Sequence, residues 1–235
     1  MAAVTDKNLR EQVFEQVRAE IIAGHAPPGS MYSVPSLAES LGTSTTPVRE
    51  ALLELVQLGL LEPHRNRGFR VTVPSVTETQ NIFDLREVLE THAARVVAGM
   101  KEKDLSVLYP LADEIAAAFE SRSFRQYLTA DRKFHHALIS AAGNPILTKT
   151  IFSLRDRMRF YGDTSAEGVE RQRQSVPEHY RIAELAEAGK TEELVALLRD
   201  HIRSWEPLFM KAIPSFAGTR TSLVLTSAAR TRKRA

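Results

Sequence analysis

The hydrophobic pattern of this 235-residue chain changes at Pro74, and the change divides the chain into two parts of different architecture. Before Pro74, three segments with apolar residues at helical spacing precede two short runs of strand-like sequence. After Pro74, long amphipathic segments follow one another as far as Ile213, without a strand pattern. The sequence therefore predicts a mainly α-helical protein with one domain over residues 1–74 and a second over residues 75–213.

The first domain begins with three predicted helices, which are expected over residues 9–24, 34–41 and 45–58. Ser33 and Ser44 stand at the N-cap positions of the second and third helices, and Gly42 ends the second. These local signals predict two short helices joined by a tight turn.

Two short strands follow the third helix, over residues 60–63 and 69–73. The turn between them contains Asn66 and Gly68, whose backbones tolerate turn conformations. Three helices followed by a two-stranded hairpin is the order of elements in a winged helix-turn-helix, which is a DNA-binding architecture. The predicted fold class is thus mainly α, with a winged helix-turn-helix of three helices plus a two-stranded wing.

The third helix and the wing carry the residues that we expect to contact DNA. Thr45, Thr46 and Arg49 lie opposite the apolar stripe near the start of the third helix, where a recognition helix meets the major groove. The wing adds four candidates for backbone or minor-groove contacts, Arg65, Arg67, Gly68 and Arg70. A solvated basic hairpin without a DNA role is the alternative interpretation of the wing.

Short motifs cover nearly all of residues 9–73: Pro28-Gly29, Leu37 to Gly42, Thr46 to Leu52, Leu58 to Leu60 and Asn66 to Gly68. Together they resemble the N-terminal signature of GntR-family bacterial transcription regulators. The chain departs from the family pattern at Thr45, where members often carry Arg, and at Val34-Pro35, where some carry Glu-Arg. These positions commonly help to read the operator, so the resemblance does not carry over an operator sequence.

The second domain is predicted to be a six-helix bundle, with helices over residues 77–101, 104–121, 123–142, 144–163, 168–189 and 191–212. Pro207 should disturb the last helix, because proline lacks a backbone N–H and clashes with the preceding turn.

Four side chains of this bundle have spacings that place them at one level. Asp131 and His135 are four residues apart and therefore lie one helical turn from each other on the same face. His179 lies ten residues before Gly189 and His201 ten residues after Thr191, so on an antiparallel hairpin both sit about 15 Å from the turn.

A lone helical histidine is more often a core or surface residue, and it is the match of four positions that predicts a site for a divalent metal ion. Three imidazoles and a carboxylate suit zinc first, with nickel, iron or manganese as alternatives. His136 points about 100° away around the helix and is not included.

The second domain also resembles the FCD ligand-binding domain of the FadR subfamily of GntR regulators. The residues that carry the resemblance are Leu85-Arg86, Leu89-Glu90, Asp131 to His135, Leu138, Ala142 to Pro145, Glu178-His179 and His201. Metal-containing members bind a divalent ion through the matching Asp and three His, so the resemblance implies that Asp131, His135, His179 and His201 bind it here. A count of six helices rather than seven indicates the VanR-like branch.

An ion with open coordination positions could bind a small carboxylate, and an arginine could pair with the far oxygens of that carboxylate. Arg86 is the first candidate, partly from the resemblance. Arg155 is the second, because reflecting Asp131 through the break at Gly143 leads to position 155 on the next helix. Arg159 is close enough to compete, as is Arg157. The alternative for each is an ion pair with a surface acid.

Composition excludes several classes of protein. The chain has no cysteine, which rules out disulfide bonds and thiolate-bound zinc. No uninterrupted apolar run approaches the ~18 residues needed to cross a bilayer, and the first eight residues lack the apolar stretch of a secretory signal. We therefore expect a cytoplasmic protein without a membrane role, and the family resemblance implies that it is bacterial.

Residues 214–235 have a composition of their own. They contain five basic residues and no acidic one, and subtracting five from the net charge of +2 leaves −3 for the rest of the chain. Such a segment is predicted to be a disordered basic tail, which could contact DNA phosphates or could be a solvated extension or an expression remnant.

These features together predict a metal-containing transcription regulator and not an enzyme. One winged domain reads too few base pairs for selectivity, so we expect a homodimer on a palindromic double-stranded DNA operator. A small organic acid that enters the helical domain is expected to change the affinity for DNA, and the family resemblance implies that the acid relieves repression.

Two alternatives stay open. The ion could be purely structural, or could itself be the sensed signal. The bundle could also be a metal-dependent hydrolase, because an ion with a free position activates water, but the sequence offers no positioned general base.

Overall fold

The computed structural model describes residues 6–22, 25–65, 67–158 and 165–217. The chain divides into two compact units, one that ends at Val73 and a second over Pro74–Pro214. Each unit is described separately below.

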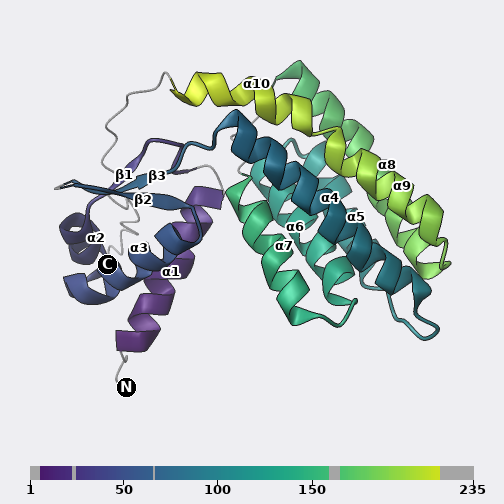
Figure 1. The fold of residues 1–235 in the computed structure, drawn as a ribbon, viewed down its shortest axis with the longest axis horizontal. Helices are drawn as coiled ribbons and strands as arrows, with labels where there is room; N and C mark the ends of the chain where they lie inside the picture. The colour runs from purple at the N-terminus through teal and green to yellow at the C-terminus, as the bar shows by residue number, and fades with distance from the viewer. Residues whose placement is uncertain (1–5, 23–24, 66, 159–164, 218–235) are drawn as a thin grey trace, which may run out of the picture. The chain divides into compact units, whose positions relative to one another are not determined.

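In its described residues the first unit contains three helices, α1 (Asp6–Ile22), α2 (Val34–Leu41) and α3 (Thr45–Gln57) (Figure 1). The side chain of Ser33 caps α2 by accepting the N–H of Ser36, and Gly42 ends this helix with a φ of 62°, both as predicted. Ser44 occupies the N-cap position of α3, but its side chain makes no cap hydrogen bond. The apolar faces of the three helices meet in one core, which includes Val17, Ile21, Leu52 and Leu55.

The wing is a sheet of three strands, β1 (Met31–Tyr32), β2 (Leu61–His64) and β3 (Gly68–Val71), in the order β1-β3-β2. The expectation of a two-stranded wing is therefore corrected: β1 pairs antiparallel with β3, with Met31 opposite Arg70 and Tyr32 opposite Phe69. A two-residue strand is too short to show an alternating pattern, so only pairing with a distant segment forms it.

Gly68 is the residue that lets β1 approach β3. Its φ is 108°, and a Cβ atom at this position would lie 2.1 Å from the backbone oxygen of Tyr32. No other residue fits there without displacing the backbone of β1.

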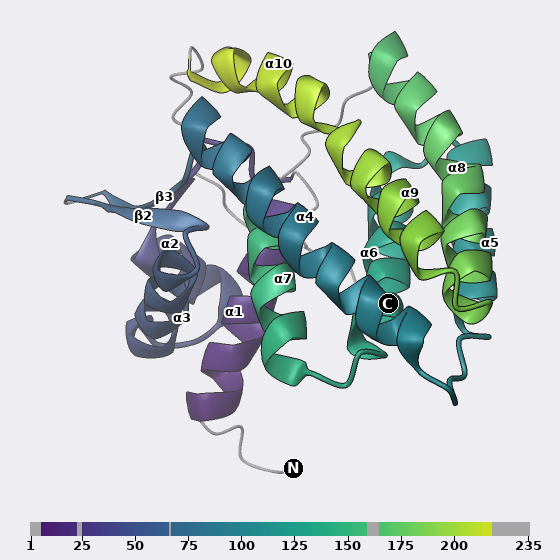
Figure 2. The same ribbon diagram turned by 45° about the vertical axis from the view of Figure 1, so that its right-hand side comes forward.

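The second unit contains seven helices among the described residues: α4 (Val76–Gly99), α5 (Leu108–Glu120), α6 (Phe124–Ser140), α7 (Pro145–Arg157), α8 (Ala166–Glu187), α9 (Thr191–Arg203) and most of α10 (Glu206–Ala217). Figure 2 shows α4 to α9 as a helical bundle. Its core is built from buried side chains of every helix from α4 to α9, such as Phe83, Ile115, Phe134, Ile182 and Leu198.

Helices α4 to α8 match the first five helices of the predicted bundle, but the single helix expected over residues 191–212 is wrong, because that segment forms both α9 and most of α10. The chain breaks at Ser204-Trp205, and α10 starts at Glu206 with Pro207 in its first turn, where the missing N–H costs no hydrogen bond. A count of six helices therefore no longer supports the VanR-like branch. Because α10 reaches Ala217, the first residues of the predicted tail are helical, whereas residues 218–235 lie outside the described part.

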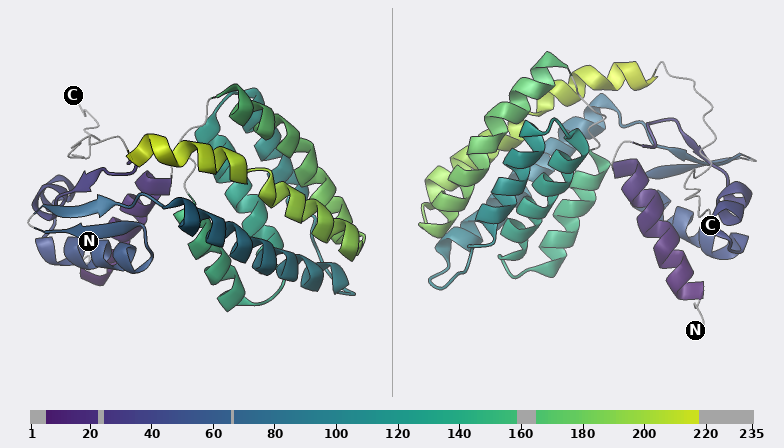
Figure 3. Two further views of the ribbon diagram at one scale, coloured as in Figure 1. Left: turned by 45° about the horizontal axis from the view of Figure 1, so that its top comes forward. Right: turned by 180° about the vertical axis from the view of Figure 1, so that it is seen from behind.

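Helices α8 and α9 form the predicted antiparallel hairpin, and the two views of Figure 3 show them side by side. Gly189 turns the chain with a φ of 67°, and the N–H of Lys190 bonds to the carbonyl of Leu185 at 2.9 Å. This hairpin brings His179 and His201 to the same level of the bundle. In the described part of the chain, no helix combines the length and apolarity needed to cross a membrane.

Candidate metal centre

Three helices of the bundle bring four metal-ligand side chains to one point. Asp131 and His135 come from α6, His179 from α8 and His201 from α9. One ligand atom from each residue lies within 4.8 Å of those of the other three. All three histidines are buried, and Asp131 is partly exposed. The four residues singled out by spacing are thus the four that the fold gathers.

Two of the imidazoles are oriented by hydrogen bonds on the side away from this point. His179 Nδ1 lies 2.7 Å from the backbone oxygen of Ser175, and His201 Nδ1 lies 2.6 Å from a carboxylate oxygen of Glu178. An Nδ1 atom in such a contact carries the proton and donates it, so that the lone pair of Nε2 is left free. Outer contacts of this kind are usual for histidines that bind a metal ion.

The free Nε2 atoms face one another and the carboxylate of Asp131. His135 Nε2 lies 3.2 Å from His201 Nε2, and Asp131 Oδ1 lies 3.2 Å from His179 Nε2 and 3.5 Å from His135 Nε2. Ligand atoms about 2.1 Å from a tetrahedral zinc ion lie about 3.4 Å from one another. The spacing and the nitrogen and oxygen donors therefore fit a first-row divalent cation, zinc included.

Burial sets the charge state of the histidines. It lowers the pKa of His135 to about 3, an effect reinforced by the positive charge of Arg155. Burial also lowers the pKa of His201 to about 4, although the hydrogen bond to Glu178 opposes this. Both imidazoles are neutral at pH 7, which is the form that binds a metal ion.

Asp131 remains ionised for a different reason. Burial by itself raises the pKa of this carboxyl group, but His135, His179 and Arg155 outweigh burial and hold the pKa well below its usual value. The centre thus offers neutral imidazoles and one carboxylate.

Two of the predicted effector arginines lie beside this centre and share one buried acid. Arg86 Nε donates to Glu90 Oε1 at 2.7 Å, and Arg155 Nε donates to the same oxygen at 3.2 Å. Arg155 Nη1 also donates to Asp131 Oδ2 at 3.4 Å. Glu90 is fully buried, its pKa is lowered to about 2 because the two arginines outweigh burial, and its Oε2 has no hydrogen-bond partner among the described residues.

The other two arginine candidates have different outcomes. Arg157 forms an ion pair with Glu78, which was the alternative expected for it. Arg159 lies outside the described residues.

Sequence reasoning assigned no role to the residues that hold the histidines in place. Glu178 also binds Arg171 at 2.8 Å, and the guanidinium of Arg171 lies 5.3 Å from the ring centre of Trp205. Ser175 accepts a hydrogen bond from the hydroxyl of Tyr127 at 2.9 Å. Two spacings within α8 could have pointed to these residues, that of Ser175 one turn before His179 and that of Arg171 two turns before Glu178; the other contacts join separate segments.

The predicted DNA-contacting residues lie on the surface of the first unit. Thr45, Thr46 and Arg49 are exposed on α3, and Arg65 and Arg67 are exposed on the wing. None of these three arginines has an ion-pair partner in the described part of the chain. Arg70, by contrast, donates to Glu62 at 2.6 Å across the β2–β3 pair. Gly68 has the structural role described above, whether or not it also contacts DNA.

Comparisons with known proteins connect both units to one family. The family of bacterial regulatory proteins named gntR matches residues 9–71, and the FCD domain matches residues 81–204. The chain belongs to the GntR family. Its second unit is an FCD domain, as the sequence motifs predicted, and the protein is a DNA-binding transcription regulator.

Individual relatives agree with this assignment. The chain is 31% identical to the uncharacterized HTH-type transcriptional regulator BphR of Paraburkholderia xenovorans, with 84% of each chain covered. It is 28% identical to a probable D-xylose utilization operon transcriptional repressor of Paenarthrobacter nicotinovorans, with 88% of this chain and 93% of the relative covered. Among solved structures it is similar to Escherichia coli McbR/YncC, with a TM-score of 0.78, 25% identity, and 90% and 99% of the two chains covered.

Proposed function

We propose that this GntR-family regulator is a repressor whose affinity for its operator is controlled by a small carboxylic acid bound at a divalent metal ion. The ion would be held by Asp131, His135, His179 and His201, with zinc as the first choice. The observation that carries the proposal is the convergence of three buried Nε2 atoms and one carboxylate oxygen at a single point. A bound ion would supply a positive centre that attracts the oxygens of an anionic ligand.

The charges around the centre explain why an acid is the expected effector. Arg86 and Arg155 carry two positive charges, and Glu90 and Asp131 carry two negative charges, so this buried group is balanced by itself. A divalent ion adds two positive charges that the protein does not neutralise. Since an uncompensated buried charge is costly, an anionic ligand gains affinity when the ion is present.

The arginines also supply recognition. Each guanidinium has donors that can pair with a carboxylate in two parallel hydrogen bonds. Arg155 already touches Asp131, so an acid on the ion would lie within reach of this side chain. Arg86 is joined to the same network through Glu90.

For the DNA-binding half, the exposed face of α3 and the wing support contact with the major groove and the phosphate backbone. Thr45, Thr46 and Arg49 are proposed for the groove, and Arg65, Arg67 and Gly68 for the backbone. One such unit covers a single half-site, so the operator is proposed to be palindromic and the active form a homodimer. Repression is proposed because one relative is named as a repressor.

Operator selection from random duplex DNA, followed by binding assays on the selected sequence, tests the proposal. The full chain is loaded with zinc and titrated with DNA in the presence and absence of a panel of mono- and dicarboxylic acids. We expect one acid to change the DNA affinity by about 5- to 150-fold, the usual range of allosteric coupling. DNA affinity that is indifferent to every acid shown to bind would contradict the proposal.

Removal of the ion separates this proposal from a structural ion. A chelator should abolish the response to the acid while the helical circular dichroism signal is retained. If the chelator instead unfolds the second unit, the ion is structural.

A further inference from the structure

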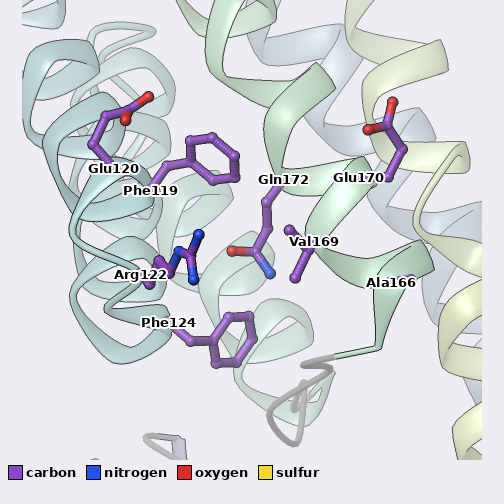
Figure 4. Close-up of a pocket in the computed structure, with 8 residues that line it drawn as sticks. All are labelled: Phe119, Glu120, Arg122, Phe124, Ala166, Val169, Glu170 and Gln172. Atoms are coloured by element: carbon purple, nitrogen blue, oxygen red, sulfur yellow. The ribbon is translucent and has the colours of Figure 1, made fainter.

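We infer that the FCD unit has a second ligand site, apart from the metal centre, that takes a small carboxylate with an apolar or aromatic body. The site is a cavity of about 720 Å³ between the turn that joins α5 to α6 and the first two turns of α8, here called the end pocket. This volume is in the range of small-molecule sites. Figure 4 shows the rings of Phe119 and Phe124 and the side chains of Arg122, Val169 and Gln172 around one space.

Gln172 is the first reason to assign a ligand to the end pocket. Its side chain lines the pocket, and the residue is only 6% exposed. Its amide has no hydrogen-bond partner among the described residues. The amide is not among the fully buried polar atoms that lack a partner, so it reaches the space of the pocket, where a ligand group can take the place of water. A polar ligand in the end pocket would supply the missing partner.

Arg122 is the second and independent reason, because it occupies a backbone position that suits glycine. Its φ is 52°, and no other non-glycine residue in the described part of the chain has a positive φ. The N–H of Arg122 bonds to the carbonyl of Phe119 at 2.9 Å, and the next N–H bonds to Ala118 at 3.0 Å. This is the pattern that commonly closes a helix with a left-handed residue.

Three other helices in the described part of the chain end in the same way, and all three use glycine. The same pair of backbone hydrogen bonds is made at Gly42 after α2, Gly59 after α3 and Gly189 after α8, with φ values of 62°, 71° and 67°. Arg122 therefore keeps a conformation that strains a side chain with a Cβ atom. Strain of this kind is found at ligand sites, and Arg122, an exposed residue, lines the pocket.

The lining decides the class of ligand. The guanidinium of Arg122 has no ion-pair partner among the described residues, and it suits a carboxylate. In Figure 4 the carboxylates of Glu120 and Glu170 point away from the space that Arg122 and Gln172 face. Glu170 is also engaged with Arg173 at 2.6 Å. Two phenylalanine rings and a valine remain for the apolar body of the ligand.

The end pocket lies about two helical turns from the metal centre. Phe124 and Gln172 each precede a candidate ligand, Asp131 and His179, by seven residues, which is about 10 Å along a helix. The hydrogen bond between the buried side chains of Tyr127 and Ser175 lies between the two levels. A ligand in the end pocket is therefore expected to bind without the ion.

Calorimetric titration of the full chain with phenylacetate, benzoate and hexanoate, with and without a chelator, tests the inference. At least one acid should bind at millimolar concentration in both conditions, and the neutral amide of that acid should bind at least about tenfold more weakly. If none of the three acids binds, or if binding is lost with the chelator, the inference is wrong.

Variants locate the binding. Arg122→Gly should lower the affinity for the acid at least about tenfold without lowering the thermal midpoint, because glycine suits the backbone there. Gln172→Leu should also weaken binding. Arg125→Ala, which removes an exposed arginine that does not line the pocket, is the matched control and should bind as the wild type does. Wild-type affinity in Arg122→Gly would overturn the assignment.

Discussion

Replacing Glu178 by glutamine should weaken zinc binding at the candidate centre, although all four ligand side chains remain. Glu178 accepts the Nδ1–H of His201 at 2.6 Å and binds Arg171 at 2.8 Å. Glutamine can still accept a hydrogen bond from the imidazole, but it carries no charge. It therefore no longer stabilises the positive charge that a bound ion places on the ring of His201.

The expected magnitude follows from the exposure of these groups. Losing an outer contact to a metal-bound histidine lowers metal affinity by about 10- to 100-fold. Because the Glu178 side chain is 24% exposed and partly screened by water, we expect the lower end, about tenfold. Arg171 is almost buried and loses its ionic partner, so the metal-free variant should also be less stable, by about 2 kcal/mol.

Trp205 makes the measurement direct. It is the only tryptophan in the chain, and its ring stacks on the Arg171 guanidinium that binds Glu178. Its fluorescence can follow zinc binding in competition with a chelator of known affinity. Glu184→Gln is a matched control on the same helix, because Glu184 forms an exposed pair with Arg181. Equal zinc affinity in the two variants would refute the role given to Glu178.

Three further predictions concern pH, the wing and DNA. Because burial lowers the pKa values of His135 and His201 from 6.5 to about 3 and about 4, the unfolded state takes up protons first as the pH falls below 6.5. The free energy of unfolding of the metal-free protein should therefore fall by about 2 kcal/mol per histidine between pH 7 and pH 5, and change little between pH 8 and pH 7. Urea unfolding at each pH measures this. A free energy of unfolding that stays constant from pH 7 to pH 5 would contradict the burial of neutral imidazoles. Gly68→Ala should destabilise the wing by about 3 kcal/mol or more, because the added Cβ atom would lie 2.1 Å from a backbone oxygen. In the control variant Gly99→Ala the added Cβ atom meets nothing within 4 Å, so this change should be neutral or stabilising. Equal thermal midpoints of the two variants would refute the role given to Gly68. Arg49→Ala should cost about 1–3 kcal/mol of operator affinity if this side chain reads a base, and unchanged binding would exclude it from the interface.

Local sequence signals account for much of the fold. Ser33 and Gly42 mark both ends of α2, and Pro207 marks the break before α10, because caps and prolines act through backbone groups within one turn. The candidate ligands were also predictable. Helical periodicity relates Asp131 to His135, and a hairpin turn relates His179 to His201, so two simple geometric rules suffice.

Other features depend on segments that meet only in the folded chain. Strand β1 exists because β3, almost forty residues later in the chain, lies beside it. Glu90 holds Arg86 and Arg155 together because α4 and α7 pack against each other, and the same packing removes Glu90 from water.

The residue spacing of this chain sets where its helices begin and end and which side chains share a face, because these depend on backbone hydrogen bonds and rotation per residue. Contacts between helices then determine which nitrogen of His201 is protonated, the burial that keeps the imidazoles neutral, and the placement of Arg122 opposite Gln172. Protonation and desolvation depend on all the atoms that surround a group, and packing supplies those neighbours from distant parts of the chain.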